Sequence, residues 1–242
     1  MIFREKAVTR IDDFDAEGFM LPSAVLKVLE NAADHHSASV TDESVDGSMH
    51  GVAWILAEWR VEFVRTPRYD DCITAETWIS EGSAAAHSNR EFLLTDEHGD
   101  VLVKAAAKLT LFDLKANRII KTDRAALERY QPEGRAVFSE KARRLLPAES
   151  FDGEAALPLR RSDIDYNGHV HNTAYLDFAL NILPEEAARS AAVAGVRIAY
   201  KRPLRLCDNA AIKFGKAEGV WNVCIYGSDG LCAIVELTER GI

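Results

Sequence analysis

The sequence contains an internal repeat, which constrains its fold more than any other feature does. Residues 12–26 match residues 162–176 at an offset of 150, and residues 60–71 match residues 197–208 at an offset of 137. In the first match, two aspartates and a glycine recur, as Asp13, Asp15 and Gly18 and again as Asp163, Asp165 and Gly168. The change of offset means that the second copy has a shorter connection, as surface loops tolerate. We therefore predict two copies of one structural unit.

Each copy shows the periodicity of one helix followed by several strands. Apolar residues recur at helical spacing, as Leu21, Val25, Val28 and Leu29 and again as Tyr175, Phe178, Ala179 and Ile182. Strand-like segments follow at 53–64, 72–80, 86–96 and 101–113, and again at 196–202, 210–219, 220–227 and 231–239. A single apolar helix needs a sheet to cover its apolar face. We therefore predict an α+β fold in which a long helix packs on a curved antiparallel sheet, twice.

Composition and charge exclude several classes of protein. The net charge of -9 argues against nucleic acid as a partner. No apolar run approaches the roughly 20 residues of a membrane span, and the first residues do not resemble a secretory signal. We therefore expect a cytoplasmic protein. The cysteines at 72, 207, 224 and 232 lack the spacing of a metal site, so we expect neither a metal nor a dissociable cofactor.

Polar and titratable residues concentrate between Arg160 and Phe178, around the start of the second helix. Asp165 supplies a carboxylate, Asn167 an amide that can orient a carbonyl or water, and His169 an imidazole that can exchange a proton near neutral pH. Backbone N–H groups near Gly168 and His169 are predicted to receive the oxyanion of a tetrahedral intermediate. The segment therefore predicts a site for acyl transfer.

The first copy lacks this combination of side chains. Glu17 stands in the place of Asn167, and Phe19 stands in the place of His169. Polar residues before a helix often serve only to cap it. A capping role can explain the residues that both copies share, but not the amide and imidazole that only the second copy has. We predict that the second half catalyses a reaction and that the first half helps to form an acyl pocket.

The sequence resembles the bacterial acyl-ACP thioesterases, relatives of the plant enzymes that release fatty acids from acyl carrier protein (ACP). The resemblance is carried by residues 21–37, 51–71, 73–80, 163–178 and 196–208. It implies two fused hotdog domains, at residues 1–135 and 158–242, joined by a linker at 136–157. It also implies hydrolysis of fatty acyl-ACP to a free fatty acid and the carrier thiol, with Asp165, Asn167 and His169 as catalytic residues.

Two positions depart from the family pattern. The family usually has Asn where this chain has His171, and a catalytic Glu where this chain has Pro203. Proline cannot act as a base, so we expect either Asp165 or His169 to activate the water. An acyl-CoA thioesterase and a catalytically weak acyl-binding protein remain as alternatives.

The expected carrier protein is strongly acidic, so a net-negative enzyme needs a local basic landing site. Basic residues that flank the polar segment are candidates for this role: Arg160, Arg161, Lys201, Arg202 and Arg205. Both a monomer and a homodimer fit the sequence.

Overall fold

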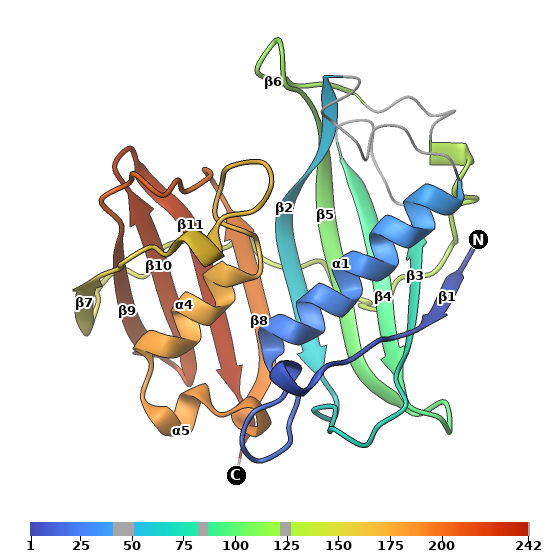
Figure 1. Cartoon of the computed structure of the whole chain (residues 1–242), viewed down its shortest axis with the longest axis horizontal. Helices are drawn as coiled ribbons and strands as arrows, with labels where there is room; N and C mark the ends of the chain where they lie inside the picture. Colours follow the sequence, from blue (N-terminus) through green and yellow to red (C-terminus); the bar gives the residue numbers. More distant parts are fainter. Residues whose placement is uncertain (41–50, 82–86, 122–126, 242) are drawn as a thin grey trace.

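A computed structural model describes residues 1–40, 51–81, 87–121 and 127–241. Their strands form a single antiparallel sheet, with the longer helices on one face (Figure 1). The strands of the first half are β1 (Phe3–Lys6), β2 (Val52–Phe63), β3 (Thr74–Ile79), β4 (Ser88–Thr95), β5 (Val101–Asp113) and the short β6 (Arg118–Ile119). Those of the second half are β7 (Gly153–Ala156), β8 (Val193–Tyr200), β9 (Ala211–Ala217), β10 (Val220–Gly227) and β11 (Gly230–Glu239). The predicted α+β class is confirmed.

The strand order has an internal symmetry. Along the sheet the strands run β1-β3-β4-β5-β2-β8-β11-β10-β9-β7, so the second half repeats the order of the first in reverse. β2 and β8 pair antiparallel at the centre, where Arg60 lies opposite Arg197. These two arginines are equivalent in the sequence repeat, which places a local twofold axis between them.

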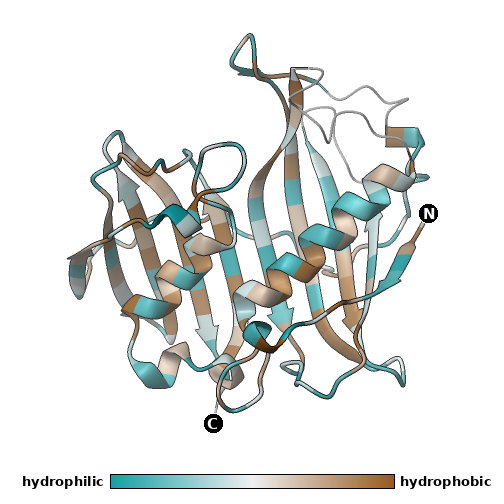
Figure 2. Ribbon diagram, viewed as in Figure 1, coloured by the Kyte–Doolittle hydropathy of each residue, from teal (hydrophilic) through white to brown (hydrophobic). Residues whose placement is uncertain are grey.

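The helices cover the sheet with their apolar faces. In α1 (Pro22–Ser39) the buried residues include Val25, Leu26 and Leu29, and the proline stands in the first turn, where its missing N–H has no helical partner to lose. α4 (Ala174–Ile182) buries Leu176 and Ala179 in the same core. Figure 2 shows polar and apolar residues alternating along many strands, as expected for a sheet with two different faces. The short α5 (Glu185–Ala188) and two 3-10 turns, η1 (Ile11–Asp13) and η3 (Arg161–Asp163), complete the helical segments that bear on the site.

The segment between the halves crosses the sheet. Val137 donates its backbone N–H to Glu91 on β4, Arg60 on β2 donates to the carbonyl of Glu140, and Ala148 donates to Asn222 on β10. Near the end of the predicted linker at 136–157, residues 153–156 form β7 and pair with β9. Neither β1 nor β7 was predicted as a strand. Residue 86, the first of one predicted strand, lies outside the described residues.

Candidate active site

The predicted catalytic residues lie in a tight loop that contains η3, which we call the second loop (residues 160–171). Asp165 accepts the backbone N–H groups of Asn167 and His169 at its Oδ1, at 2.8 and 3.3 Å. Its own N–H donates to the carbonyl of His169 at 2.8 Å. Gly168 has a φ of +79°, which glycine adopts without steric cost. Asp165 is therefore the residue that closes the loop.

The equivalent loop of the first half, which we call the first loop (residues 10–21), has the same backbone hydrogen bonds. Asp15 Oδ1 accepts the N–H groups of Glu17 and Phe19 at 3.0 and 2.9 Å, and the N–H of Asp15 donates to the carbonyl of Phe19 at 2.8 Å. Gly18 also has a φ of +79°. The loop therefore forms equally well with Glu17 and Phe19 in place of the amide and the imidazole.

The predicted oxyanion donors, the backbone N–H groups of Gly168 and His169, make hydrogen bonds within the second loop. The N–H of Gly168 donates to the carbonyl of Asp165 at 3.0 Å, and the N–H of His169 donates to the Asp165 carboxylate. Both groups are satisfied within the loop, and helix α4 begins only at Ala174. A substrate oxyanion would have to break the loop's own hydrogen bonds to reach them.

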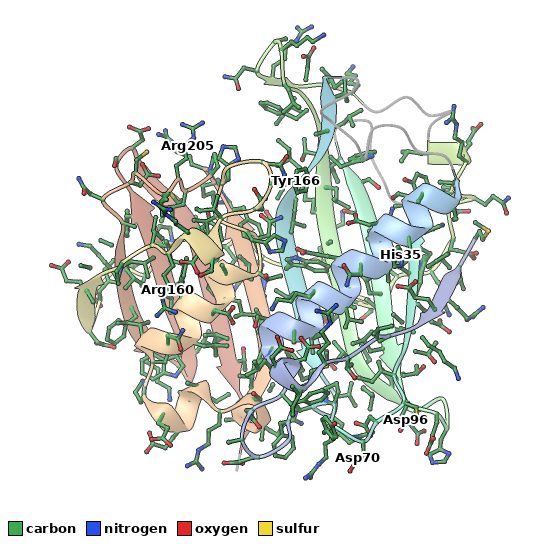
Figure 3. All side chains as sticks on the ribbon, viewed as in Figure 1. His35, Asp70, Asp96, Arg160, Tyr166 and Arg205 are labelled. Atoms are coloured by element: carbon green, nitrogen blue, oxygen red, sulfur yellow. The ribbon has the colours of Figure 1, made fainter. Side chains whose placement is uncertain are left out.

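The other predicted residues are accessible. Asn167 is exposed, and its side-chain N–H lies 3.4 Å from Asp165 Oδ2, while His169 is half-buried. All five candidate carrier-binding residues, at positions 160, 161, 201, 202 and 205, are exposed. Figure 3 shows Arg160 and Arg205 over the second half of the molecule and Tyr166 near its border with the first half. A hydrogen bond from the N–H of Val170 to the carbonyl of Leu204 ties the second loop to the segment that carries three of these basic residues.

The fold adds a group that the sequence did not predict, on the helix of the first half. Nε2 of His171, in the second loop, lies 3.7 Å from Oε2 of Glu30 on α1. The charges of Lys27 and Asp34, both also on α1, act on His171 as well. The sequence holds one signal: Glu30 is a polar residue between buried positions, since Val28, Leu29 and Ala32 are buried. Nothing in the sequence indicates that it meets His171.

Several pKa values are displaced in this cluster. Burial, and next the negative charge of Asp34, raise the pKa of Glu30 to about 8. Desolvation also raises the pKa of Asp34, although its side chain remains exposed. Desolvation lowers the pKa of His171, which the charge of Asp165 partly offsets. His171 is thus mostly neutral at neutral pH, and Glu30 is mostly protonated.

Two hollows lie near these residues. A small cavity of about 50 Å³ lies between α1 and the sheet of the first half, lined among others by Asp34, Ile79 and Leu109. An open groove of about 800 Å³ in the second half is lined by residues 154–159 and by parts of 206–213. Among the described residues, no cluster of three or more histidine, cysteine or acidic side chains could hold a metal ion. In the same residues, no helix is both long and apolar enough to cross a membrane.

Solved structures with this arrangement define the class of fold. The chain superposes on an acyl-ACP thioesterase from Bacteroides thetaiotaomicron with a TM-score of 0.87 and 16% identity, covering 99% of this chain and 98% of that one. It superposes on a 12:0-ACP thioesterase from Umbellularia californica with a TM-score of 0.85 and 19% identity, covering 99% and 97%. The protein therefore has the fold of the acyl-ACP thioesterases.

The chain belongs to the acyl-ACP thioesterase family: its residues 1–130 match the N-terminal domain of that family and residues 148–219 match the C-terminal domain. It is similar to an acyl-[acyl-carrier-protein] hydrolase from Cuphea viscosissima, with 27% identity over 158 residues, and to oleoyl-acyl carrier protein thioesterase 1 from Arabidopsis thaliana, with 26% identity over 229 residues. The matches cover 63% and 85% of this chain, but only 38% and 61% of those relatives.

Proposed function

We propose that this protein hydrolyses a fatty acyl thioester carried on ACP, releasing a free fatty acid and the carrier thiol. The observation that carries the proposal is the contrast between the two loops. Their backbones make the same hydrogen bonds, but only the second presents an amide and an imidazole, at Asn167 and His169. Side chains that the loop does not need for its structure are available for chemistry. The family match over both domains favours the same reaction.

The three loop residues have different roles in this proposal. Asp165 positions the loop, because its Oδ1 is committed to two backbone N–H groups. His169, which is half-buried, exchanges a proton with the reacting thioester or its leaving thiol. Asn167 contributes an exposed amide that can orient the thioester carbonyl.

The internal repeat supports a finer description of the fold, as two fused hotdog domains. Among the described residues, each half contributes one longer helix and five strands on the main path of the sheet, in the same order from the centre outward, together with a loop of the same geometry. The proposed boundary follows residue 135, and we propose that the second domain begins by residue 153, because β7 pairs with β9. The matches to a separate N-terminal and C-terminal domain agree with this division.

The acyl chain is proposed to enter between α1 and the sheet of the first half. The cavity there, at about 50 Å³, is far smaller than the roughly 300–1,000 Å³ of typical ligand pockets. The helix and sheet must therefore separate, or side chains must rotate, when an acyl chain binds.

The carrier protein is proposed to dock on the second half. The groove of about 800 Å³ is bordered in sequence by the basic residues at 160 and 161 on one side and by Arg205 on the other. Positive charge beside a groove suits an acidic carrier, because opposite charges steer the two proteins together. An acyl-CoA thioesterase would share the chemistry without this docking surface.

The test exploits the two matching loops. We expect His169→Phe to lower kcat for acyl-ACP at least about a hundredfold, the lower range for loss of a general acid or base. The first loop holds a phenylalanine at this position with the same hydrogen bonds, so the variant should fold. The matched control, Phe19→His, should retain the wild-type rate.

Released thiol is measured with short-, medium- and long-chain acyl-ACPs and acyl-CoAs in parallel. Faster turnover of acyl-CoA would favour the CoA alternative. Binding without hydrolysis of any of these thioesters would favour an acyl-binding protein and reject the proposed activity.

A further inference from the structure

Resting on the proposed function, we propose that Glu30, on the helix of the first half, is the general base that activates the hydrolytic water, and that His171 of the second loop orients this water. The carboxylate of the second loop, Asp165, is committed to two backbone N–H groups of that loop. The proposal therefore assigns the base to a carboxylate from the other half of the chain.

The geometry of the pair suits a shared water molecule. Glu30 Oε2 and His171 Nε2 are 3.7 Å apart, which is too long for a direct hydrogen bond. At this separation, one water molecule can lie about 2.8 Å from both atoms and form a hydrogen bond with each. The pair therefore fits a single bridging water.

The hydrogen bonds of His171 indicate which nitrogen carries the proton. Nδ1 lies 2.8 Å from the hydroxyl of Thr173 and accepts the backbone N–H of the same residue at 3.4 Å. We therefore assign the ring proton to Nε2, which faces Glu30. In this state His171 donates a hydrogen bond to the water, the water donates one to the carboxylate, and one lone pair of the water oxygen remains for attack.

Glu30 has few alternative partners. Its side chain is 21% exposed, and the indole N–H of Trp59 on β2 lies near the carboxyl and acts on it as a hydrogen-bond donor, which lowers the pKa of Glu30. The geometry of this contact is poor, since Oε1 of Glu30 and Nε1 of Trp59 are both buried without a well-formed hydrogen bond. An ordered water can complete the hydrogen bonds of buried polar atoms that pair this poorly.

The charged and titratable groups around Glu30 come from three elements: Lys27 and Asp34 on α1, His171 on the second loop and Tyr200 on β8. Tyr200 stays protonated, since burial raises its pKa well above the ordinary value. The positive charge of Lys27 only partly offsets burial and Asp34, the two main causes of the raised pKa of Glu30. Because its pKa is raised, the ionised carboxylate of Glu30 is a stronger base than an ordinary glutamate.

The reaction balances without a cofactor. Ionised Glu30 takes a proton from the water as the water oxygen bonds to the acyl carbon. The tetrahedral intermediate then collapses, the C–S bond breaks, and the leaving thiolate receives a proton from Glu30 directly or from His169. In the second case His169 takes a proton from solvent and Glu30 releases one to solvent. The products are the fatty acid and the carrier thiol, and the enzyme returns to its starting state.

The test is the pH dependence of kcat/KM for acyl-ACP in the full chain, between about pH 6 and about pH 9.5. We expect the wild-type value to rise with pH to a midpoint near 8, because Glu30 must be ionised. Glu30→Gln should lower kcat at least about a hundredfold, with little change in KM, and should remove this rise. Asp34→Asn should move the midpoint to lower pH, because it removes a negative charge that opposes the ionisation of Glu30.

The outcomes separate this inference from the proposed function. A wild-type chain that hydrolyses no acyl thioester rejects the proposed function itself. An active wild type together with a folded Glu30→Gln variant of equal kcat rejects only the role of Glu30. Should Glu30→Gln fail to fold, the Asp34→Asn profile decides, since an unchanged midpoint would show that another group ionises.

Discussion

Asp15 and Asp165 hold two loops of the same shape, so their chemistry can be compared at constant geometry. Each accepts two backbone N–H groups at Oδ1, and each loop contains a glycine in the left-handed region. The difference lies in what surrounds them. Asp165 acts on the charge state of His171, whereas Arg68 lies over the Phe19 ring in the first loop. The role of each aspartate in closing its loop therefore explains its presence in both loops. We expect catalytic activity only in the second loop.

The corresponding prediction compares Asp15→Asn with Asp165→Asn. Both variants keep a side-chain oxygen for the loop but lose the charge, so each should lower the free energy of unfolding by a similar amount, of order 1 kcal/mol. Only Asp165→Asn should also lower kcat, by about tenfold or more. Urea denaturation and thiol-release assays on both variants check this. Equal loss of activity in the two would mean that loop geometry, rather than the charge of Asp165, limits the reaction.

At the scale of secondary-structure elements, hydrophobic periodicity predicted the longer helices and strands, whose pattern is contained in one continuous segment of sequence. The long helix and the strands were predicted because their apolar residues recur at regular spacing over many residues. β1 and β7 were missed because each has four residues and lies at an edge of the sheet. They also occupy equivalent places, at an offset of 150, so extending the repeat toward the N-terminus would have indicated them.

The site was predicted less completely than the fold. The second loop is a continuous segment, so its polar residues could be recognised together. Glu30 and His171 belong to different halves, and only the packing of α1 beside the second loop and α4 brings them near each other. The oxyanion assignment stays a prediction: the sequence indicated backbone N–H groups near a helix but did not show which of them the loop itself uses.

The buried carboxyl on α1 has a measurable effect on stability. Its pKa in the folded state is about 8, against an ordinary value of 4.5. Because the pKa of Glu30 is higher in the folded state than in the unfolded state, this group contributes stability that is fully present below about pH 4.5. The contribution is lost as the pH rises from 4.5 through about 8. The reason is that unfolding frees the carboxyl to ionise in water.

Glu30→Gln should therefore be more stable than the wild type near pH 9, and the two should converge toward pH 4.5. The measurement is urea denaturation at a series of pH values. A matched control is Glu185→Gln on α5, whose glutamate side chain is 85% exposed, and it should follow the wild-type curve. Parallel curves for Glu30→Gln and the wild type would indicate that Glu30 ionises normally. This readout does not depend on substrate, so it holds even if the reaction is a different one.

At the scale of the whole molecule, the two halves form one unit through the pairing of β2 with β8. The same junction brings α1 of the first half beside the second loop and α4, where a hydrogen bond between Ser23 and Asp177 also crosses from one half to the other. A site that uses groups from both halves requires the junction to be intact. Duplication therefore doubles the sheet and, in the proposed mechanism, lets one copy supply the base while the other supplies the polar loop.

The same duplication offers a control for the docking of the carrier. Reversing two charges beside the groove, in Arg160→Glu with Arg205→Glu, should lower kcat/KM for acyl-ACP about tenfold at low salt, because opposite charge steers the acidic carrier to the enzyme. The equivalent residues of the first half are Arg10 and Arg68, which are also exposed. Reversing those two charges changes the net charge equally but lies away from the groove, so it should have little effect.

The comparison is completed with a small acyl-pantetheine thioester, which lacks the carrier protein. Both double variants should hydrolyse it at nearly the wild-type rate, and added salt should reduce the difference between them on acyl-ACP. Steady-state rates at low and high salt on both substrates provide the measurement. If the Arg160 and Arg205 reversal slowed both substrates equally, the basic residues would be acting on the catalytic loop rather than on the carrier, since Leu204 is hydrogen-bonded to that loop through Val170.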